Sequence, residues 1–400
     1  MKIALIGNMN NNFFSIMRYL RDLGMDAHLF MYENEYDHFK PEKDTYFIER
    51  YNPYIHVLSV KPSVKGLLFL DKKKIKKELE GYDLFIGCTI APAIFYKLNM
   101  RLDIIAPHDD GIEYTSYPKL LPQRFFTALA RRYVVNLQIK GIEHNTTKII
   151  ASAVQEITND TLTKFNWYDK LIKKYLLMVY LENHKNPELN NIIEHMHGHD
   201  LVIFSHTRHI WREESMIEDY IIKDGGKALD KLIIAYSNFL QENPNTKALL
   251  IFFEYGDDVE ASKALIAKHG IEAHVKWLPL MARKDILQLI DHADIVVDSL
   301  GASMWSGVGW EALSRGKIIM QNILQSDEAY KKEMGHELPF IMKANRVEEV
   351  QKHLNEFINN REHYSQKAEY NREWFDKYAG VGLAEDYKKI LETLYEDKKR

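Results

Sequence analysis

Short apolar segments alternate with stretches of helical periodicity along most of this chain. Residues 2–7 are mostly apolar and end at a glycine, and four apolar residues behind them fall on one helical face, namely Phe13, Ile16, Met17 and Leu20. Continuous apolar strands of this kind are typical of parallel sheets that helices cover on both faces. The pattern therefore predicts an α/β fold.

The alternation is interrupted once, by a polar stretch that follows residue 180. Strands are predicted before it at 2–7, 27–31, 84–87, 103–106, 148–151 and 176–180, and after it at 201–204, 248–253, 274–278, 295–298 and 317–320. From Val347 onward the pattern indicates charged helices. We therefore predict two doubly wound, Rossmann-like domains, 1–185 and 186–375, and a helix at 376–400 that returns to the first domain.

Composition and charge narrow the class of partner. The 400 residues carry 53 Lys and Arg against 57 Asp and Glu, a net charge of -4, so no basic field predicts a nucleic-acid partner. The single cysteine, Cys88, excludes intramolecular disulfides and cysteine-based zinc sites and is typical of a reducing compartment. No apolar run approaches the roughly 20 residues that span a bilayer. We expect a cytoplasmic protein, and the sequence leaves its oligomeric state open.

The loops that follow the strands are the first place to look for chemistry, because doubly wound sheets bind ligands beyond the carboxyl ends of their strands. The first loop, 7–12, has one glycine where a dinucleotide fingerprint needs three. Neither a G-x-x-x-x-G-K-[ST] nor a G-x-S-x-G sequence occurs. The sequence thus disfavours a nicotinamide dehydrogenase, a P-loop nucleotide hydrolase and an α/β-hydrolase.

Two cations follow strands of the second half. Arg208 comes after the strand at 201–204, and Lys227 stands at the head of a helix. They could bind a diphosphate, the arginine through two parallel hydrogen bonds and the lysine as a point charge. The alternative is a pair of solvated surface cations, which the spacing alone favours.

The loop after the strand at 295–298 is rich in glycine. Gly301, Gly307 and Gly309 stand in it, and a helix is predicted to begin near Gly309. Such a loop lets backbone amides and the helix dipole face a phosphate, while Glu311 in the first helical turn can accept from ribose hydroxyls. The alternative is a glycine-rich turn whose glutamate only balances the helix dipole.

Five segments, taken in order, resemble the carboxyl-terminal half of GT-B glycosyltransferases. They are SHTR at 205–208, KALDKLIIAY at 227–236, VKWLPL at 275–280, DILQLIDHADIVVDS at 285–299 and GWEALSRGK at 309–317. The family is the large superfamily of retaining, nucleotide-sugar-dependent enzymes of bacterial glycolipids and polysaccharides. The resemblance implies two Rossmann-like domains that face each other across a cleft and close over the donor.

The resemblance also assigns the donor diphosphate to a set of residues in the second domain. Arg208 and Lys227 would bind it with their side chains, and Gly307, Val308 and Gly309 would bind it with their backbone. These roles are implied by the family pattern.

The remaining donor contacts include two departures from that pattern. Glu311 would bind the ribose, and Leu278 and Leu280 would lie near the base. Ala228 stands where the family usually has glycine after the lysine. Ser303 stands where the first of two paired glutamates would contact the donor sugar, which leaves the identity of the sugar open.

The first half resembles the family in one segment, DIIAPHDDGI at 103–112. It is similar to the strand-end motif whose histidine faces the donor. His108 would hydrogen-bond the sugar or the developing charge, and Asp109 or Asp110 would orient it or the acceptor hydroxyl. The alternative is a solvated acidic turn whose histidine makes a local backbone bond.

Other conspicuous features are predicted to be structural. The histidine-rich segment at 195–199 would lie in the interdomain linker, Asp257 and Asp258 lack the D-x-D spacing of metal-dependent glycosyltransferases, and Cys88 would be a small buried apolar side chain. The lysine-rich run at 72–77 is predicted to be a solvated helix face, with peripheral contact to an anionic membrane surface as the alternative.

Together these observations predict a glycosyltransferase that moves a sugar from a nucleotide diphosphate sugar to a hydroxyl of a glycan, glycolipid or other acceptor. We expect retention at the anomeric carbon, no metal and no other cofactor, and a place in bacterial-type polysaccharide, glycolipid or glycoconjugate synthesis. Two alternatives stay open. One is a nucleotide-sugar 2-epimerase-like enzyme on the same fold, and the other is a catalytically silent sugar- or nucleotide-binding subunit.

Overall fold

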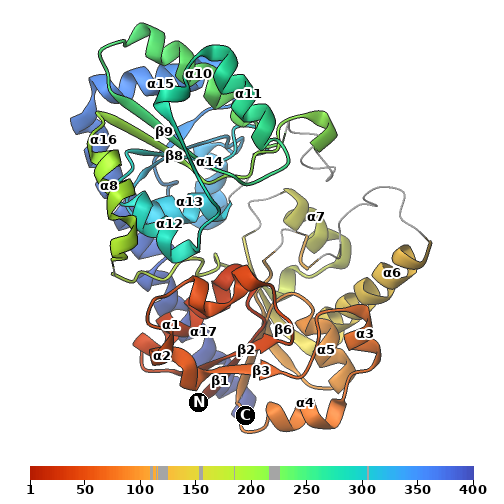
Figure 1. Cartoon of the computed structure of the whole chain (residues 1–400). Coiled ribbons are helices and arrows are strands. Elements are labelled where there is room, and N and C mark those ends of the chain that lie inside the picture. Colours follow the sequence, from red (N-terminus) through yellow and green to blue (C-terminus); the bar gives the residue numbers. More distant parts are fainter. Residues whose placement is uncertain are drawn as a thin grey trace. The chain divides into compact units, whose positions relative to one another are not determined.

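The chain divides into two compact units in a computed structural model that describes residues 1–108, 111–113, 115, 125–152, 156–183, 185–215, 226–303 and 306–400. Unit 1 contains residues 1–182, 330–336 and 377–400, and unit 2 contains residues 183–329 and 337–376. Each unit holds one parallel sheet (Figure 1). The predicted pair of parallel, helix-covered sheets is therefore confirmed.

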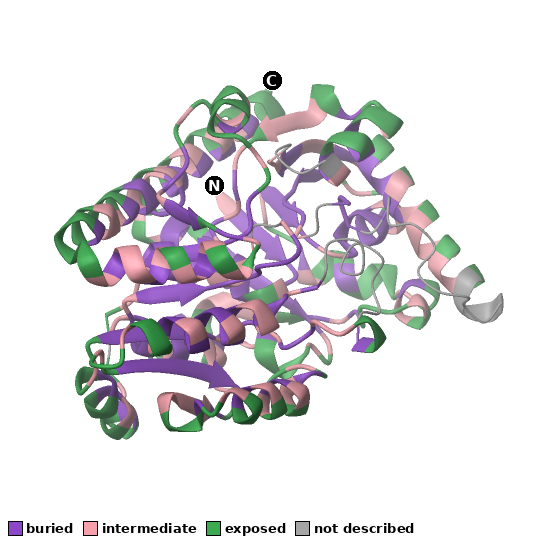
Figure 2. Ribbon diagram, turned by 90° about the horizontal axis from the view of Figure 1, so that it is seen from above, coloured by how far each residue is buried: buried purple, intermediate pink, exposed green. Residues whose placement is uncertain are grey.

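Unit 1 contains a seven-stranded sheet with the order β3-β2-β1-β4-β5-β6-β7. The strands are β1 Lys2–Ile6, β2 Asp26–Tyr32, β3 Ile55–Leu58, β4 Leu84–Gly87, β5 Leu102–Ile105, β6 Thr146–Ala151 and β7 Leu171–Lys173. The helices are α1 Asn12–Asp22, α2 Ile48–Tyr51, α3 Val64–Leu68, α4 Lys72–Glu78, α5 Ala91–Leu98, α6 Phe125–Lys140, α7 Glu156–Phe165 and α17 Val381–Lys399. Its central strands β1, β4 and β5 are almost wholly buried. Figure 2 shows the general pattern, with buried strands and with helices that are partly exposed.

Unit 2 contains a six-stranded sheet with the order β10-β9-β8-β11-β12-β13. The strands are β8 Leu201–Ser205, β9 Ala248–Phe253, β10 Val275–Leu278, β11 Ile295–Val297, β12 Ile318–Gln321 and β13 Ile341–Lys343. The helices are α8 Asn190–His197, α10 Leu229–Glu242, α11 Val259–His269, α12 Arg283–Ile290, α13 Gly307–Ser314, α15 Val347–Asn359 and most of α16 Arg361–Tyr378; α14 Asp327–Met334 runs from unit 2 into unit 1.

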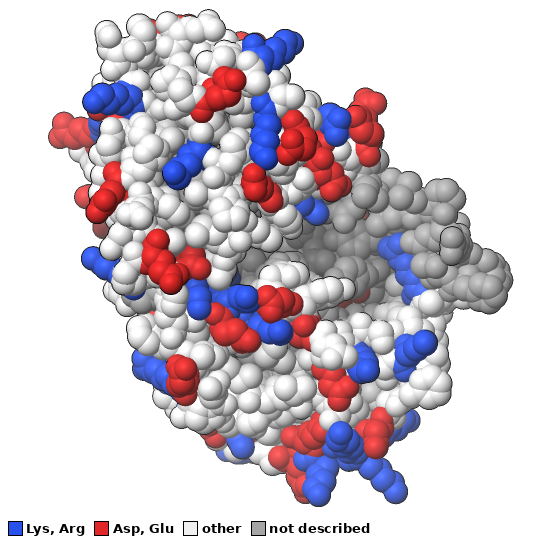
Figure 3. Space-filling view, viewed as in Figure 1, with Lys and Arg blue, Asp and Glu red and all other residues white. Residues whose placement is uncertain are grey.

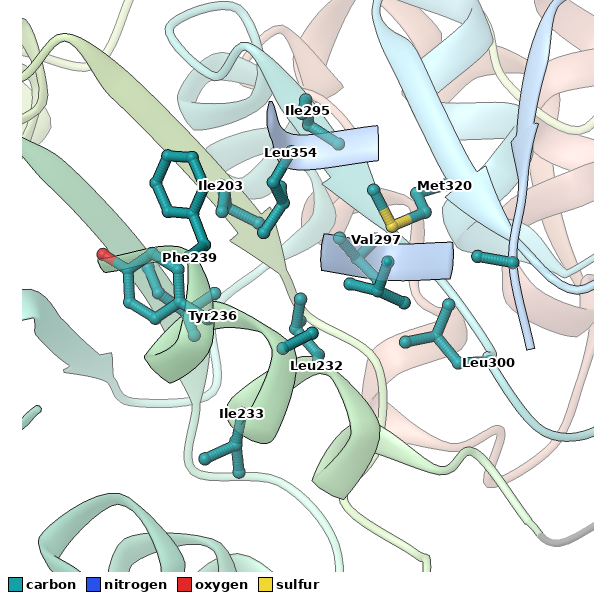
Figure 4. Packing of buried hydrophobic residues seen from close by; sticks show 14 of the residues in the cluster. Ile203, Leu232, Ile233, Tyr236, Phe239, Ile295, Val297, Leu300, Met320 and Leu354 are labelled. Carbon is teal, nitrogen blue, oxygen red and sulfur yellow. The ribbon is translucent and has the colours of Figure 1, made fainter. Parts of the chain in front are cut away.

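The core of unit 2 forms where α10 packs on the sheet. Figure 4 shows the cluster, to which α10 contributes Leu232, Ile233, Tyr236 and Phe239, α15 contributes Leu354, and the strands contribute Ile203, Ile295, Val297 and Met320. The apolar positions of α10 recur every three or four residues, which places them on one helical face.

The helical end of the chain belongs to both units. α15 and α16 lie in unit 2, whereas α17 packs on α1 of unit 1. Lys388 of α17 donates to the carbonyl of Leu23 at 3.2 Å, and the Tyr387 hydroxyl donates to the carbonyl of Tyr175 at 2.9 Å. None of the helices among the described residues combines the length and the apolar character that crossing a membrane requires.

Four strand assignments differ from the sequence prediction. The short edge strands β3, β7 and β13 were not predicted, because their three or four residues carry no clear apolar run. The predicted strand at 176–180 is wrong, since this segment forms no ladder. Its carbonyls accept instead from side chains of α1, that of Met178 from Ser15 at 3.5 Å and that of Val179 from Tyr19 at 3.2 Å.

Candidate functional site

Each sheet has a point where the strand order reverses, and ligands bind at such points in doubly wound folds. In unit 1 the order reverses between β1 and β4, and in unit 2 it reverses between β8 and β11. The loops that leave these strands carry most of the candidate residues.

The loop after β8 carries Arg208 and is fixed just beyond it. The backbone N–H of His209 donates to the Tyr255 carbonyl at 2.7 Å, and the His209 carbonyl accepts from the Asp258 N–H at 2.9 Å. Gly256 has a φ of +113°, and a Cβ there would lie 2.4 Å from the His209 oxygen. This close approach requires glycine at position 256.

A buried carboxylate holds the next part of that loop. Asp258 accepts from the N–H groups of Trp211 and Arg212 at 2.6 and 2.9 Å and from Arg212 Nε at 2.7 Å, and it also accepts from the Ser215 hydroxyl. Burial raises the pKa of Asp258, but these hydrogen bonds outweigh burial and leave the pKa below its ordinary value. The pair at 257–258 thus includes a structural acceptor, Asp258, in keeping with the prediction that the pair is structural.

Lys227 is joined to two loops through its backbone. Its N–H donates to the Ile210 carbonyl at 2.7 Å, and its carbonyl accepts from the Leu300 N–H at 3.0 Å. The side chains of Lys227 and Arg208 are both partly exposed. The segment before α10 therefore ties the loop after β8 to the loop after β11, and it places the two predicted cations in one part of unit 2.

Ala228 follows the lysine in a left-handed conformation, with φ 50° and ψ 42°, immediately before α10. A left-handed backbone disfavours a Cβ, which explains why glycine is usual at this position in the family that the sequence resembles. In this chain alanine adopts it while almost fully buried.

The glycine-rich loop ends in a capped helix. The Ser306 hydroxyl accepts from the Val308 N–H at 3.2 Å and donates to Asp298 at 2.5 Å, where Asp298 directly follows β11. Because of this cap, α13 begins at Gly307 rather than near Gly309. Gly307 and Val308 are partly exposed and Gly309 is buried, so the first turn opens toward solvent at its first two residues.

Glu311 is consequently the fifth residue of α13, and its predicted place in the first turn is wrong. Its side chain is buried. Oε1 lies 2.8 Å from Arg283 Nε at the head of α12, and Oε2 lies 2.6 Å from His206 Nε2 in the loop after β8. Burial raises the pKa of Glu311, but the charge of Arg283 and the contact with His206 outweigh it and lower the pKa. The carboxylate is ionised and held from two sides.

The residues predicted near the base differ in exposure. Leu278 ends β10 and is buried, and its carbonyl accepts from the Glu254 N–H at 2.9 Å. Leu280 is 63% exposed in the segment that leads from β10 to Arg283. Of the two leucines, only Leu280 therefore exposes an apolar side chain.

Ser303 does not replace the missing glutamate with a similar group. Its Oγ accepts from the Leu324 N–H at 2.9 Å, and its side chain is half-buried. The hydroxyl thus ties the loop after β11 to the segment behind β12.

In unit 1 His108 follows β5, and Asp109 and Asp110 lie outside the described residues. The ring of His108 contacts Asn10, in the segment after β1, and Asn12, the first residue of α1. Its Nε2 lies 3.0 Å from Asn10 Nδ2, and its Nδ1 lies 2.9 Å from Asn12 Nδ2. Both of these ring contacts of His108 are made with side chains.

A buried carboxylate anchors the backbone of His108. Glu113 is fully buried, and its Oε1 accepts from the N–H groups of His108 and Thr89 at 3.1 and 2.7 Å. Thr89, Ile112 and Glu113 have left-handed φ values of 54°, 47° and 51°. Non-glycine residues hold such angles only where the surrounding structure enforces them.

The sequence did not identify five residues that contact the predicted ones: Asn10, Asn12, Glu113, His206 and Arg283. Asn10, Asn12 and His206 lie in the segments 7–12 and 205–208 that the sequence already singled out, which was a usable signal. Glu113 and Arg283 lie outside the segments singled out and carried none.

Two other predictions concern residues away from these loops. The histidine-rich segment lies on and just after α8, where His197 Nε2 is 2.9 Å from His292 Nδ1. Within the described ranges, no three His, Cys, Asp or Glu side chains gather as they would around a metal ion. Cys88 is buried, as predicted, and burial raises the pKa of its thiol.

A family model described as Glycosyl transferases group 1 matches residues 224–374. No curated protein matches the chain in sequence. The solved structure of HepE from Anabaena with UDP and glucose is similar to this chain, with a TM-score of 0.66, 15% identity, and coverage of 98% of this chain and 100% of HepE.

Two further solved structures share the architecture. Sucrose-phosphate synthase from Thermosynechococcus elongatus has a TM-score of 0.62 at 11% identity, with 99% of this chain and 100% of that one covered. UDP-GlcNAc 2-epimerase from Neisseria meningitidis, bound to UDP-GlcNAc, has a TM-score of 0.56 at 12% identity, with 98% and 100% covered. The family match over residues 224–374 and the shared fold agree with the resemblance that the sequence motifs indicated.

The backbone at Ala228 gives a stability prediction. Ala228→Gly should raise the free energy of unfolding of unit 2 by about 1 kcal/mol, because glycine adopts the left-handed conformation without a Cβ clash. Urea denaturation measures the change. The control is Ala264→Gly, on the exposed face of α11, which should lower the same free energy by about 0.5–1 kcal/mol. Equal destabilisation by both variants would contradict the role given to Ala228.

Proposed function

We propose, from the premise that this chain is a glycosyltransferase of the GT-B fold, that it transfers a sugar from a nucleoside diphosphate sugar to an acceptor hydroxyl. HepE binds UDP and UDP-glucose in its own structures, which supports a nucleotide sugar as the donor.

One observation carries the proposal. The backbone bonds of Lys227 to Ile210 and Leu300 join the strand-end loops on both sides of the switch point of unit 2. This brings the segment of Arg208, the side chain of Lys227 and the loop that leads to α13 into one region. Two partly exposed cations beside a helix N-terminus suit the two phosphates of a nucleoside diphosphate.

The ribose is assigned to Glu311. Each oxygen of this carboxylate meets one protein group, Arg283 or His206, and a carboxylate oxygen has lone pairs for more than one donor. The ribose hydroxyls can therefore donate to a carboxylate that is already oriented. Leu280 supplies an exposed apolar surface for the base.

In this proposal His108 binds the donor sugar. The cationic side chains of Arg208 and Lys227, which bind the diphosphate, take the place of a metal ion. In this proposal the positive charges of Arg208 and Lys227 stabilise the leaving diphosphate, which is the task that a divalent cation performs in other transferases. The family resemblance supports retention at the anomeric carbon and an acceptor that is a glycan or a glycolipid in polysaccharide or glycoconjugate synthesis.

A panel of nucleotide sugars tests the function. Purified protein should release nucleoside diphosphate slowly from at least one donor, and Arg208→Ala and Lys227→Ala should each weaken its binding by about 1.5–3 kcal/mol, or roughly 10- to 150-fold in Kd. Lys268→Ala, an exposed lysine near the end of α11, is the matched control and should bind normally.

The same panel separates the alternatives. Conversion of the donor to an isomeric nucleotide sugar would indicate an epimerase. Binding without turnover would indicate a silent subunit. Unchanged affinity in both the Arg208 and the Lys227 variant would remove the diphosphate assignment.

Ser303 gives a test of donor choice. The Ser303 hydroxyl accepts a hydrogen bond from the Leu324 N–H. Ser303→Glu should therefore lose this hydrogen bond and place a carboxylate where the donor sugar is expected. We predict a loss of turnover of roughly tenfold or more with the best donor of the panel. A faster reaction with a neutral hexose donor would show that the serine is not adapted to a different sugar.

We also propose a peripheral membrane contact through α3 and α4 of unit 1. Leu68 and Phe69 are 52% and 83% exposed, and the lysines around them are exposed as well: Lys61, Lys65, Lys72, Lys73, Lys74, Lys76 and Lys77. Figure 3 shows blue side chains, with red ones among them, at the lower edge where Figure 1 draws α4. Ile75 faces the core, so the apolar part of the contact would be Leu68 and Phe69.

Vesicle sedimentation tests this contact. Phosphatidylcholine vesicles should retain the protein only when they contain phosphatidylglycerol, and Lys73→Glu with Lys76→Glu should weaken retention by about 1 kcal/mol per lost cation or more. Phe69→Ser should also weaken retention, whereas Leu324→Ser, an exposed leucine of unit 2, should not. Retention that ignores the anionic lipid would contradict the proposal.

A further inference from the structure

Two histidines face each other at the edge of the unit 1 sheet. His28 lies on β2 and His56 lies on β3, which is an edge strand. Phe30 pairs with His56 in the ladder, and side chains two residues apart on a strand share a face, so His28 and His56 lie on the same face. His28 Nδ1 is 2.8 Å from His56 Nε2, and the two ring planes differ by 14°. A contact between the two imidazoles therefore joins β2 to β3.

The carboxylate of Asp26 fixes the direction of this contact. Burial raises the pKa of Asp26, but the hydrogen bonds and charges of His28 and Arg21 outweigh burial and lower the pKa. The ionised carboxylate only accepts, and its Oδ1 lies 3.0 Å from His28 Nε2, so this ring nitrogen carries the proton. Nδ1 of the neutral His28 ring then carries the lone pair, and His56 donates to it from Nε2.

The space between the two facing nitrogens holds one proton. When a first proton is added to the neutral pair, His56 can take it on Nδ1 and still donate from Nε2. When both rings are charged, every ring nitrogen carries an N–H, and two N–H groups would point at each other across 2.8 Å. The contact between His28 and His56 therefore tolerates one added proton and not two.

The surroundings also disfavour added charge. His28 is 8% exposed and His56 is partly exposed. Burial lowers the pKa of both rings. Asp26 raises the pKa of His28, but the charges of Lys2 and Arg21 add to burial, and the pKa stays below its ordinary value. The charges of His28 and Lys2 act on His56 in the same direction as burial.

Two tyrosines complete the cluster. The ring of Tyr54 packs edge-on against His28, with 5.7 Å between the ring centroids, and the Tyr82 hydroxyl lies 3.5 Å from His56 Nε2. Nζ of Lys2, on β1, lies 4.4 Å from the centroid of the Tyr82 ring. A second positive charge in the histidine pair would therefore be added to a partly buried cluster that already has a cation beside it.

We propose that the contact between His28 and His56 is a pH-sensitive switch, which holds the edge strand β3 on β2 while the pair carries at most one added proton and releases it when both rings are charged. β3 is four residues long and pairs on one side only, with β2, so it has few other interactions that hold it in the sheet. The switch is independent of the proposed function, because it uses none of the donor-binding residues.

The direction of the pH effect follows from the lowered pKa values. In the unfolded chain a histidine titrates near its ordinary pKa of about 6.5. The folded rings have lower pKa values, so the unfolded chain binds more protons than the fold as the pH decreases below about 6.5. The contact is therefore complete at neutral pH, and the pairing of β3 with β2 weakens in acid.

Histidine ring NMR of the full chain tests the shared proton. His28→Gln and His56→Gln samples identify the signals of the pair among those of the 17 histidines. The wild-type pair should titrate in two steps that are separated by about 1 pH unit or more. In His56→Gln the ring of His28 should titrate in one step, at a higher pH than the second step of the wild type, because no charged ring faces it.

Hydrogen exchange, expressed relative to the rate of an unstructured peptide at the same pH, tests the release of β3. Between about pH 7 and pH 5, the protection of residues 55–58 in the wild type should fall roughly tenfold or more, while that of β1 changes less than about twofold. His56→Gln should keep this protection, because an amide can donate to Nδ1 or accept from it and is never charged. His144→Gln, which replaces an exposed histidine just before β6, is the control and should behave as the wild type.

Two results would overturn the proposal. One is independent titration of the two rings, with steps that the His56→Gln substitution does not change. The other is an equal loss of β3 protection in the wild type and in His56→Gln. If His56→Gln does not fold, the wild-type titration and the wild-type loss of protection decide between the outcomes, since a pair that titrates in separated steps without releasing β3 would also contradict the switch.

Discussion

Backbone groups that leave a parallel sheet at its switch point lose their ladder partners, and the need to satisfy them shapes both candidate sites. In unit 2 the Asp258 carboxylate and the close approach at Gly256 fix the loop that carries Arg208. In unit 1 the Glu113 carboxylate accepts from the N–H groups of Thr89 and His108. A buried carboxylate can serve several N–H groups at once, so each acidic residue organises a loop of its unit.

The carboxylate of Glu311 is stabilised by a different kind of partner from those of Asp258 and Glu113. Its partners are the charged Arg283 and the ring of His206 rather than backbone amides. Removing one partner of a buried ion pair leaves an uncompensated charge and costs about 3–5 kcal/mol. A ligand hydroxyl adds a hydrogen bond to such a carboxylate without replacing a partner. Glu311 can therefore combine a structural role with a binding role.

Helices and strands that follow from local periodicity were predicted from the sequence. Features that depend on pairing between distant parts of the chain were not. The strands β8 and β9 and the helix α10 follow from continuous or periodic apolar residues, whereas the edge strands β3, β7 and β13 are too short to show a period. Asn12 and His108 are separated by 96 positions, so their contact exists only once β1 and β5 share a sheet. The site residues that the sequence did predict lie in loops at the carboxyl ends of strands. In a parallel sheet these ends share one edge, so the order of strands and helices is enough to indicate that edge as the binding side.

Strained backbone gathers at the same places as the candidate chemistry. Thr89, Ile112 and Glu113 in unit 1 and Ala228 in unit 2 adopt left-handed angles without being glycine, at a cost of about 1–3 kcal/mol each. Gln138 helps to hold the first group, since its Nε2 donates to the Thr89 carbonyl at 2.6 Å. Such angles persist only where the surrounding contacts hold them, and beside His108 these contacts come from Glu113 and Gln138.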